Sequence, residues 1–212
     1  KVSDNGNIIG VDISKPLLSL FKKKYKNIKN LKAIRKDLQQ SKLENNKFDH
    51  AISRFGVMFF EYPLIAFKHI YQSLRENASL TFVCWANFRY NQFFTIPTYS
   101  VSENTDINIP KISNKPGPFA FKDKIFVQKL LKQSGFKKIT IKNIKTKLKI
   151  NSITTDVDIM MSLGIGAQMI RENNINKKTY DIIRKDIRDK LTKIYNEQNY
   201  YNARIYIVVA YK

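Results

Sequence analysis

The sequence predicts an α/β protein built on a mostly parallel sheet. Short apolar runs alternate with helical patterns, and several of these runs end in a polar residue. This alternation favours crossover units between parallel strands. The first run, NIIGVDIS (7–14), is apolar and rich in β-branched residues up to Asp12, as in a strand that is covered on both faces. The chain closes on another apolar strand at 203–212.

The composition is that of a folded domain. The chain has 212 residues, of which 43% are hydrophobic and 12% aromatic, and this excludes a disordered protein. It contains neither an apolar run of membrane-spanning length nor a signal pattern, so a soluble, cytoplasmic protein is expected. The single cysteine, Cys84, leaves no pair for an internal disulfide and no cysteine-based metal site, and no bound metal is expected.

The net charge of +21 is compatible with a nucleic-acid partner. The lysines are scattered over every segment, however, and the densest block, 22–36, resembles the solvated face of one helix and the loop after it. A general bias towards lysine, asparagine and isoleucine is therefore favoured over a nucleic-acid partner. A small-molecule substrate is the main expectation.

The first part of the chain is expected to hold strands and helices in alternation. The expected elements are a strand at 8–12, a helix after Ser14, strands at 31–36 and 48–57, a helix at 63–75 and a strand at 79–86. Ser14 can cap the first helix, and Pro16 is tolerated in its first turn.

Residues 87–121 interrupt this rhythm. They hold four of the six prolines and many aromatic residues, so a long irregular loop that forms a pocket wall is expected. The elements expected after it are a helix from Asp123 to Ser134, stopped by Gly135, a strand at 137–150, and helices at 155–172 and 177–196. The apolar positions of the strand change parity around Asn143, which predicts a bulge or a break there.

Polar and aromatic residues stand at the ends of successive predicted strands. These residues are Asp12, Asp37, Ser53, Arg54, Phe55, Gly56, Trp85 and Ala86. The exits of parallel strands lie side by side, so these residues should converge on one crevice. An ionised carboxylate there can accept two ribose hydroxyls. Alternatively, Asp12 is a helix cap, Asp37 a turn residue and Trp85 a core residue.

Other common catalytic patterns are absent from the sequence. It has no glycine-rich phosphate loop, no zinc-type cluster of histidines and cysteines, and no nucleophile-elbow serine. His50 lies at the start of its strand and His69 lies inside a helix, and both are interpreted as structural or surface residues.

In order along the chain, several segments resemble class I S-adenosylmethionine-dependent methyltransferases, especially the ubiquinone and menaquinone biosynthesis group. The segments are GVDISKPLL, the acid in KDLQ, SRFGVMFF, VCW, GPFAFKDKIFVQKLLKQSGFKKITI and IYIVVAY. The resemblance implies a Rossmann-like fold with an antiparallel C-terminal strand and a helical cap. It also implies methyl transfer by direct displacement to a small, apolar or aromatic acceptor.

The resemblance also implies roles for residues. Asp12 with Ile13 would hold the ribose of S-adenosylmethionine, Asp37 with Leu38 would lie beside the adenine, and Ser53 with Arg54 would line the methionine end. The substrate pocket would be formed by Phe55, Phe60, Trp85 and Tyr99, and Tyr62 is a further candidate for its lining. The sequence singles out no catalytic base.

The sequence departs from the family in two places. The turn before the 79–86 strand reads Glu76-Asn77-Ala78, and the glycine-rich loop that should precede Asp12 by about twenty residues is missing. An N-terminally truncated chain is therefore expected, lacking the strand that would lie between those of Asp12 and Ser53. The chain alone would then bind its cofactor poorly and could be inactive.

This interpretation divides the chain into four parts. They are a cofactor-binding part at 1–86, a substrate-side loop at 87–121, the rest of the core at 122–150 and 199–212, and a helical cap at 151–198.

Three alternative functions remain. They are an RNA methyltransferase that uses the basic surface, a nicotinamide-dependent oxidoreductase, which also ends its second strand in an acid, and a non-catalytic fragment.

Overall fold

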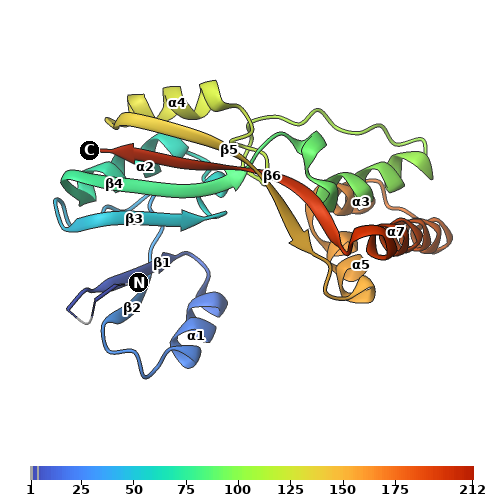
Figure 1. Cartoon of the computed structure of the whole chain (residues 1–212), viewed down its shortest axis with the longest axis horizontal. Coiled ribbons are helices and arrows are strands. Elements are labelled where there is room, and N and C mark those ends of the chain that lie inside the picture. Colours follow the sequence, from blue (N-terminus) through green and yellow to red (C-terminus); the bar gives the residue numbers. More distant parts are fainter. Residues whose placement is uncertain (1, 4) are drawn as a thin grey trace.

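The structure is a computed structural model that describes residues 2, 3 and 5–212 (Figure 1). Its helices and strands are, in chain order, β1 (Ile8–Asp12), α1 (Lys15–Lys24), β2 (Leu31–Arg35), β3 (Phe48–Arg54), η1 (Val57–Phe59), α2 (Pro63–Ser73), β4 (Leu74–Trp85), η2 (Phe88–Tyr90), α3 (Gln92–Glu103), α4 (Lys124–Gln133), β5 (Lys137–Lys149), α5 (Ile153–Ser162), α6 (Gly164–Glu172), α7 (Lys177–Gln198) and β6 (Tyr200–Tyr211). The α/β class predicted from the alternating patterns is confirmed.

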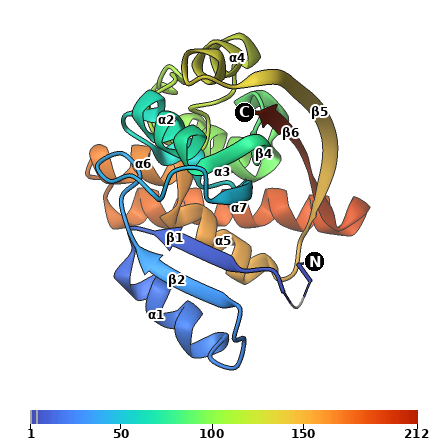
Figure 2. The ribbon, with the colours of Figure 1, turned by 90° about the vertical axis from the view of Figure 1, so that its left-hand side faces the viewer.

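The described strands form two separate sheets. β1 and β2 pair in parallel, and a four-stranded sheet has the order β3-β4-β6-β5. β3 and β4 are parallel in it, and β6 is antiparallel to both of its neighbours. Figure 1 shows β1 between β3 and β2, beside the larger sheet. β1 and β2 run across the view in Figure 2, whereas β3 and β4 run across Figure 1, so the two sheets are not aligned.

One face of the four-stranded sheet carries the main core. Helices α2 and α4 cover this face, and the buried side chains include Phe67, Phe82, Phe121, Leu131 and Val208. Asp123 caps α4 as predicted, because its carboxylate accepts a hydrogen bond from the N–H of Ile125. Ser14 likewise caps α1.

A second core lies between helices α3, α5, α6 and α7. Ile183, Ile187 and Leu191 of α7 are fully buried in it. The prediction that residues 87–121 form an irregular loop is wrong for their first part, because Gln92–Glu103 is the helix α3 with Pro97 inside it. Burial of one side of α3 against the other helices outweighs the local proline signal.

The predicted bulge at Asn143 is also wrong. The pairing of β5 with β6 continues without interruption from Thr140 to Lys149, and the register shift lies between Lys137 and Thr140. The parity changes because Ile141 packs on the main core, whereas Leu148 packs on the helical core. These two cores lie on opposite faces of one long strand.

Several element boundaries also differ from prediction; β4, for example, begins at Leu74 and not at residue 79. β3 ends at Arg54 and not at residue 57. The single helix expected at 155–172 is two helices, α5 and α6, broken between Leu163 and Gly164, where Gly164 has a φ of +88°. A left-handed backbone of this kind favours glycine and ends the continuous helix.

Two classes of feature are absent from the described part of the chain. No helix within it is both long and apolar enough to cross a membrane. No group of three or more histidine, cysteine, aspartate or glutamate side chains within it could hold a metal ion.

Candidate functional site

Asp12 and Asp37 lie at the carboxyl ends of the two neighbouring strands of the small sheet: Asp12 is the last residue of β1, and Asp37 follows β2. Asp12 is paired with Arg35 across the strands, and the carbonyl oxygen of Asp12 accepts a hydrogen bond from Lys36 N at 3.1 Å. The Oδ1 atom of Asp12 accepts from Ser14 N at 2.8 Å, and Oδ1 of Asp37 accepts from Gln39 N at 2.8 Å. Each carboxylate thus holds the turn after its strand. Among the described residues, neither Oδ2 atom has a hydrogen-bond partner, so both can accept from a ligand.

The turn after β2 contacts the N-cap and the middle of α2. The carbonyl oxygen of Leu38 lies 2.7 Å from Nδ1 of His69, and Tyr62 N donates to Oε1 of Gln39 at 2.7 Å. Helix α2 follows the exit of β3 in the chain. These two contacts therefore bring the Asp37 turn to the exit side of the larger sheet and give His69 a structural role.

The exit of β3 has an unusual backbone. Phe55 has a φ of +59°, a left-handed conformation that costs a residue with a Cβ about 1–2 kcal/mol. Its N–H donates to Val83 O at 2.9 Å, and its ring stacks on Trp85 at the exit of β4, with centroids 4.4 Å apart and planes at 20°. Ser53 Oγ accepts from Val57 N at 3.3 Å. Backbone strain of this kind is common at binding sites.

The Phe55–Trp85 stack continues into a chain of aromatic rings. Successive centroids lie 5.3 Å (Trp85–Phe94), 5.0 Å (Phe94–Phe119), 5.4 Å (Phe119–Phe88) and 6.2 Å (Phe88–Tyr99) apart. We call these residues, from Phe55 to Tyr99, the aromatic chain. Phe88, Phe94 and Phe119 were not predicted individually, although the aromatic content of 87–121 was the signal for them.

The other predicted site residues do not belong to the aromatic chain. Phe60 packs into the main core, edge-on to Phe67 at 6.2 Å, and it does not join the aromatic chain. Ile13, Arg54 and Tyr62 are exposed. The carbonyl oxygen of Ile13 accepts a hydrogen bond from its own sheet, from Nε of Arg35 at 3.1 Å.

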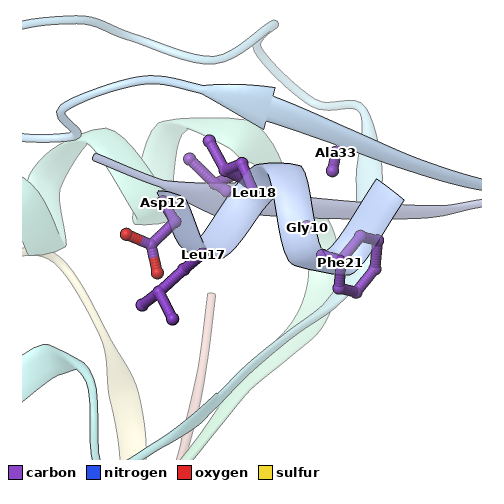
Figure 3. A pocket seen from close by; sticks show the side chains of 7 residues that line it. Gly10, Asp12, Leu17, Leu18, Phe21 and Ala33 are labelled. Atoms are coloured by element: carbon purple, nitrogen blue, oxygen red, sulfur yellow. The ribbon is translucent and has the colours of Figure 1, made fainter. Parts of the chain in front are cut away.

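A hollow of ≈ 160 Å³ lies between β1 and α1 (Figure 3). It is lined by Gly10, Val11, Asp12, Leu17, Leu18, Phe21 and Ala33. Figure 3 shows the Asp12 carboxylate beside Leu17, away from Phe21 and Ala33. Ligand pockets for drug-sized molecules usually measure roughly 300–1,000 Å³. The hollow therefore reflects thin packing of α1 on the sheet rather than a complete cofactor site.

Cys84 lies in β4, next to Trp85, and is fully buried. Burial raises the pKa of its thiol to about 12. The thiol therefore stays protonated at neutral pH, which excludes Cys84 as a nucleophile.

A comparison with known protein families matches the segment that carries Asp12 and Asp37. The methyltransferase domain family matches residues 2–82. No curated relative matches the sequence significantly. The predicted resemblance to S-adenosylmethionine-dependent methyltransferases is confirmed for residues 2–82, and S-adenosylmethionine is the cofactor of this family.

Solved structures show the same methyltransferase fold. Phosphoethanolamine N-methyltransferase 2 from Haemonchus contortus, crystallised with phosphomonomethylethanolamine and S-adenosylhomocysteine, is 16% identical with a TM-score of 0.55; the match covers 98% of this chain and 44% of that one. YcgJ from Bacillus subtilis is 12% identical with a TM-score of 0.57, over 97% and 82% of the chains. A putative methyltransferase from Bacillus halodurans C-125 is 13% identical with a TM-score of 0.53, over 99% and 94%. This chain thus spans less than half of the Haemonchus protein.

Proposed function

We propose that this chain takes part in S-adenosylmethionine-dependent methyl transfer to a small acceptor. The observation that carries the proposal is the placement of Asp12 and Asp37 at the carboxyl ends of β1 and β2, inside the segment that matches the methyltransferase family. The free Oδ2 atom of Asp12 suits a ribose hydroxyl, and Asp37 with Leu38 suits the adenine side. Ser53 and Arg54, at the exit of β3, would line the methionine end.

S-adenosylmethionine supplies a methyl group on a positively charged sulfur, which is a good leaving group. The protein then has to hold the acceptor in line with that methyl carbon and to exclude water. Phe55 and Trp85 offer a flat apolar wall at the exits of β3 and β4 for this purpose. The strained backbone of Phe55 fixes the orientation of this wall.

An apolar or aromatic acceptor fits the aromatic chain best. Tyr99, which is 42% exposed, is the last ring of the aromatic chain, and its hydroxyl is a polar group that can orient an acceptor. Helix α1 and strand β5, which both carry several lysines, lie on different parts of the molecule in Figure 1. This scatter supports a small molecule over RNA.

The test is a chemical-shift titration of the chain with S-adenosylhomocysteine. We expect weak binding, with a dissociation constant above about 100 µM, because the strand edges beside the site are open. The amides of Ile13 and Leu38 should shift. Asp12→Asn and Asp37→Asn should each weaken binding about tenfold, the loss of one charge-assisted hydrogen bond.

Asp49→Asn is the matched control, because Asp49 pairs with Arg75 and is not among the residues proposed to bind the cofactor. It should leave binding unchanged. Shifts that are equal in all three variants, or absent around Ile13 and Leu38, would contradict the proposal. Micromolar binding by the wild-type chain would instead contradict only the expectation that the open edges weaken the site.

A further inference from the structure

Acidic residues are distributed less evenly along the chain than lysines. The sequence has no aspartate or glutamate between Asp123 and Asp156, and none after Glu197. These two segments contain β5 and β6, which pair with each other. β5 carries six lysines in its sequence KKITIKNIKTKLK. The paired strands therefore hold many positive charges and no negative ones.

The second half of β5 and the first half of β6 present these cations on one face. Side chains alternate between the two faces of a strand, and residues that are in register on neighbouring strands share a face. Lys145 is in register with Arg204, and the pairing continues in steps of two to Lys149 and Tyr200. We call this surface the basic face; it consists of Lys145, Lys147, Lys149, Tyr200, Asn202 and Arg204.

The basic face is turned away from the helical layer. Leu148 and Tyr201, which alternate with its residues, pack in the helical core. Trp85 is in register with Ile205, which is also on the helical side, so the Phe55–Trp85 wall lies on the opposite face of the sheet. Figure 2 shows β5 curving along the outer side of the molecule, next to β6. The three lysines of the basic face are exposed.

Aromatic rings support two of the cations. The ammonium group of Lys147 lies 4.0 Å from the centroid of the Tyr200 ring. The guanidinium of Arg204 lies 4.0 Å from the ring of Tyr90 in η2, and that of Arg89 lies 4.7 Å from the same ring. Cation–π contacts of this kind restrict where the charged groups lie. Among the described residues, no ion pair includes a cation of the basic face.

The start of α4 bounds the basic face at one end. Tyr206 follows Arg204 on the same side of β6, and the ammonium group of Lys124 lies 5.2 Å from the centroid of its ring. The Tyr206 hydroxyl donates to Lys122 O at 3.2 Å. Asp123, the acid at this end, caps α4 through its hydrogen bond from Ile125 N. The positive row therefore runs from α4 towards α7.

The shape of the basic face suits a linear polyanion. Alternate residues of a strand lie about 6.6 Å apart, so the lysines of β5 form an evenly spaced row on a stripe only two strands wide. None of the large exposed apolar side chains among the described residues belongs to this face, so nothing on it could enter a lipid bilayer. The rings of Tyr90 and Tyr200 already carry cations, which favours contacts to phosphates over stacking of bases.

We propose that the basic face binds the phosphate backbone of single-stranded nucleic acid, without preference for base sequence. Lys145, Lys147 and Lys149 contact successive phosphates along β5, and Arg204 contacts the same strand from β6. The nucleic acid is a binding partner here and not the methyl acceptor, since the face lies on the opposite side of the sheet from the Phe55–Trp85 wall. The inference is therefore independent of the proposed methyl transfer and goes beyond it.

The test measures binding of the full chain to a fluorescein-labelled oligothymidylate of about twenty nucleotides, by anisotropy at several salt concentrations. A strand that loses three phosphate contacts loses about 2 from the slope of log K against log salt, because each contact contributes about 0.7. The variant in which Lys145, Lys147 and Lys149 are all changed to glutamine should show this loss and bind at least about tenfold more weakly at 0.1 M salt. The corresponding triple arginine variant should keep both the slope and the affinity.

The matched control changes Lys22, Lys23 and Lys24 of α1 to glutamine. These side chains are also exposed, and the control removes the same net charge. Its slope should change by less than about 0.5. Urea unfolding checks that both triple variants are folded. In the wild-type chain, the oligonucleotide should shift the amides of 145–149 and 200–204.

Four results would overturn the proposal. The first is an equal loss of slope in both glutamine variants, which would mean attraction by net charge alone. The second is a set of amide shifts that lies outside the basic face. The third is tighter binding to vesicles of phosphatidylserine and phosphatidylcholine than to the oligonucleotide, which would assign the face to a membrane. The fourth is tighter binding to polyglutamate, which would assign it to an acidic protein segment.

Discussion

Replacing Tyr201 by phenylalanine should remove a stabilising hydrogen bond between the sheet and the helical layer while leaving the shape of the core intact. Tyr201 of β6 is 1% exposed, and its hydroxyl donates to Oδ2 of Asp156 in α5 at 2.8 Å. Asp156 is itself 8% exposed. A hydrogen bond to a charged group contributes about 1.5–3 kcal/mol, and its loss leaves a buried carboxylate without this donor. Asp156 lies in the first turn of α5, where the helix dipole stabilises its negative charge by up to about 1 kcal/mol and so offsets part of this loss.

Tyr201→Phe should therefore lower the free energy of unfolding by about 2 kcal/mol, measured by urea denaturation. Tyr200→Phe is the matched control, because the Tyr200 hydroxyl makes no hydrogen bond among the described residues. A double-mutant cycle with Asp156→Ala should give a coupling energy above about 1 kcal/mol. Coupling below about 0.5 kcal/mol, or an equal loss in Tyr200→Phe, would refute the reasoning.

The same pair gives a pH dependence. Burial, the hydrogen bond and the charge of Asp156 all raise the pKa of Tyr201 above its usual value. Unfolded tyrosine titrates near pH 10, so this contribution to stability is present below about pH 10 and is lost as the pH rises further. Tyr201→Phe should flatten the fall in unfolding free energy above pH 10. Burial also raises the pKa of Tyr206, which accounts for a remaining slope.

Three further predictions concern single residues. Gly166→Ala should cost about 1–3 kcal/mol in urea unfolding, because the new Cβ would lie 2.8 Å from the backbone of Pro97; an unchanged midpoint would contradict the close α3–α6 contact. Lys190 forms ion pairs with Asp186 at 2.7 Å and with Glu103 at 2.5 Å. Burial lowers the pKa of Lys190, but these ion pairs raise it by more, so the pKa lies above its usual value. Lys190→Met should thus cost about 1 kcal/mol at neutral pH and less above pH 10.4, as unfolding at both pH values would show. Cys84 should react with iodoacetamide at pH 8 only as fast as the chain unfolds, and rapid labelling in native buffer, seen by mass spectrometry, would count against its burial.

Local signals predicted the elements whose ends are set by nearby residues. Ser14 and Asp123 begin helices because their side chains bond N–H groups two or three residues on, a pattern that is visible in the sequence. Gly135 ends α4 with a φ of +106°, which the sequence also indicates. The positions of Asp12 and Asp37 at strand ends could be predicted for the same reason, because each acid is contiguous in the sequence with its strand.

Features that depend on distant packing could not be predicted. Pro97 signals a loop locally, but α3 is held by side chains from α5, α6 and α7. The parity change near Asn143 has the appearance of a bulge, yet it records two cores on opposite faces of β5. The left-handed backbone of Phe55 has no local signature either, since glycine would be expected at such a position.

The helical layer and the candidate acceptor site are mechanically joined through α3. Phe93 packs against Tyr201 of the helical core at 5.8 Å and against Phe94 of the aromatic chain at 5.4 Å. Phe94 in turn packs edge-on against Trp85 at 5.3 Å. Close-packed side chains transmit a displacement because the interior has little free volume. We therefore expect a change in the packing of α3 to displace Trp85, so that the shape of the proposed acceptor wall depends on residues of the helical layer that do not touch it.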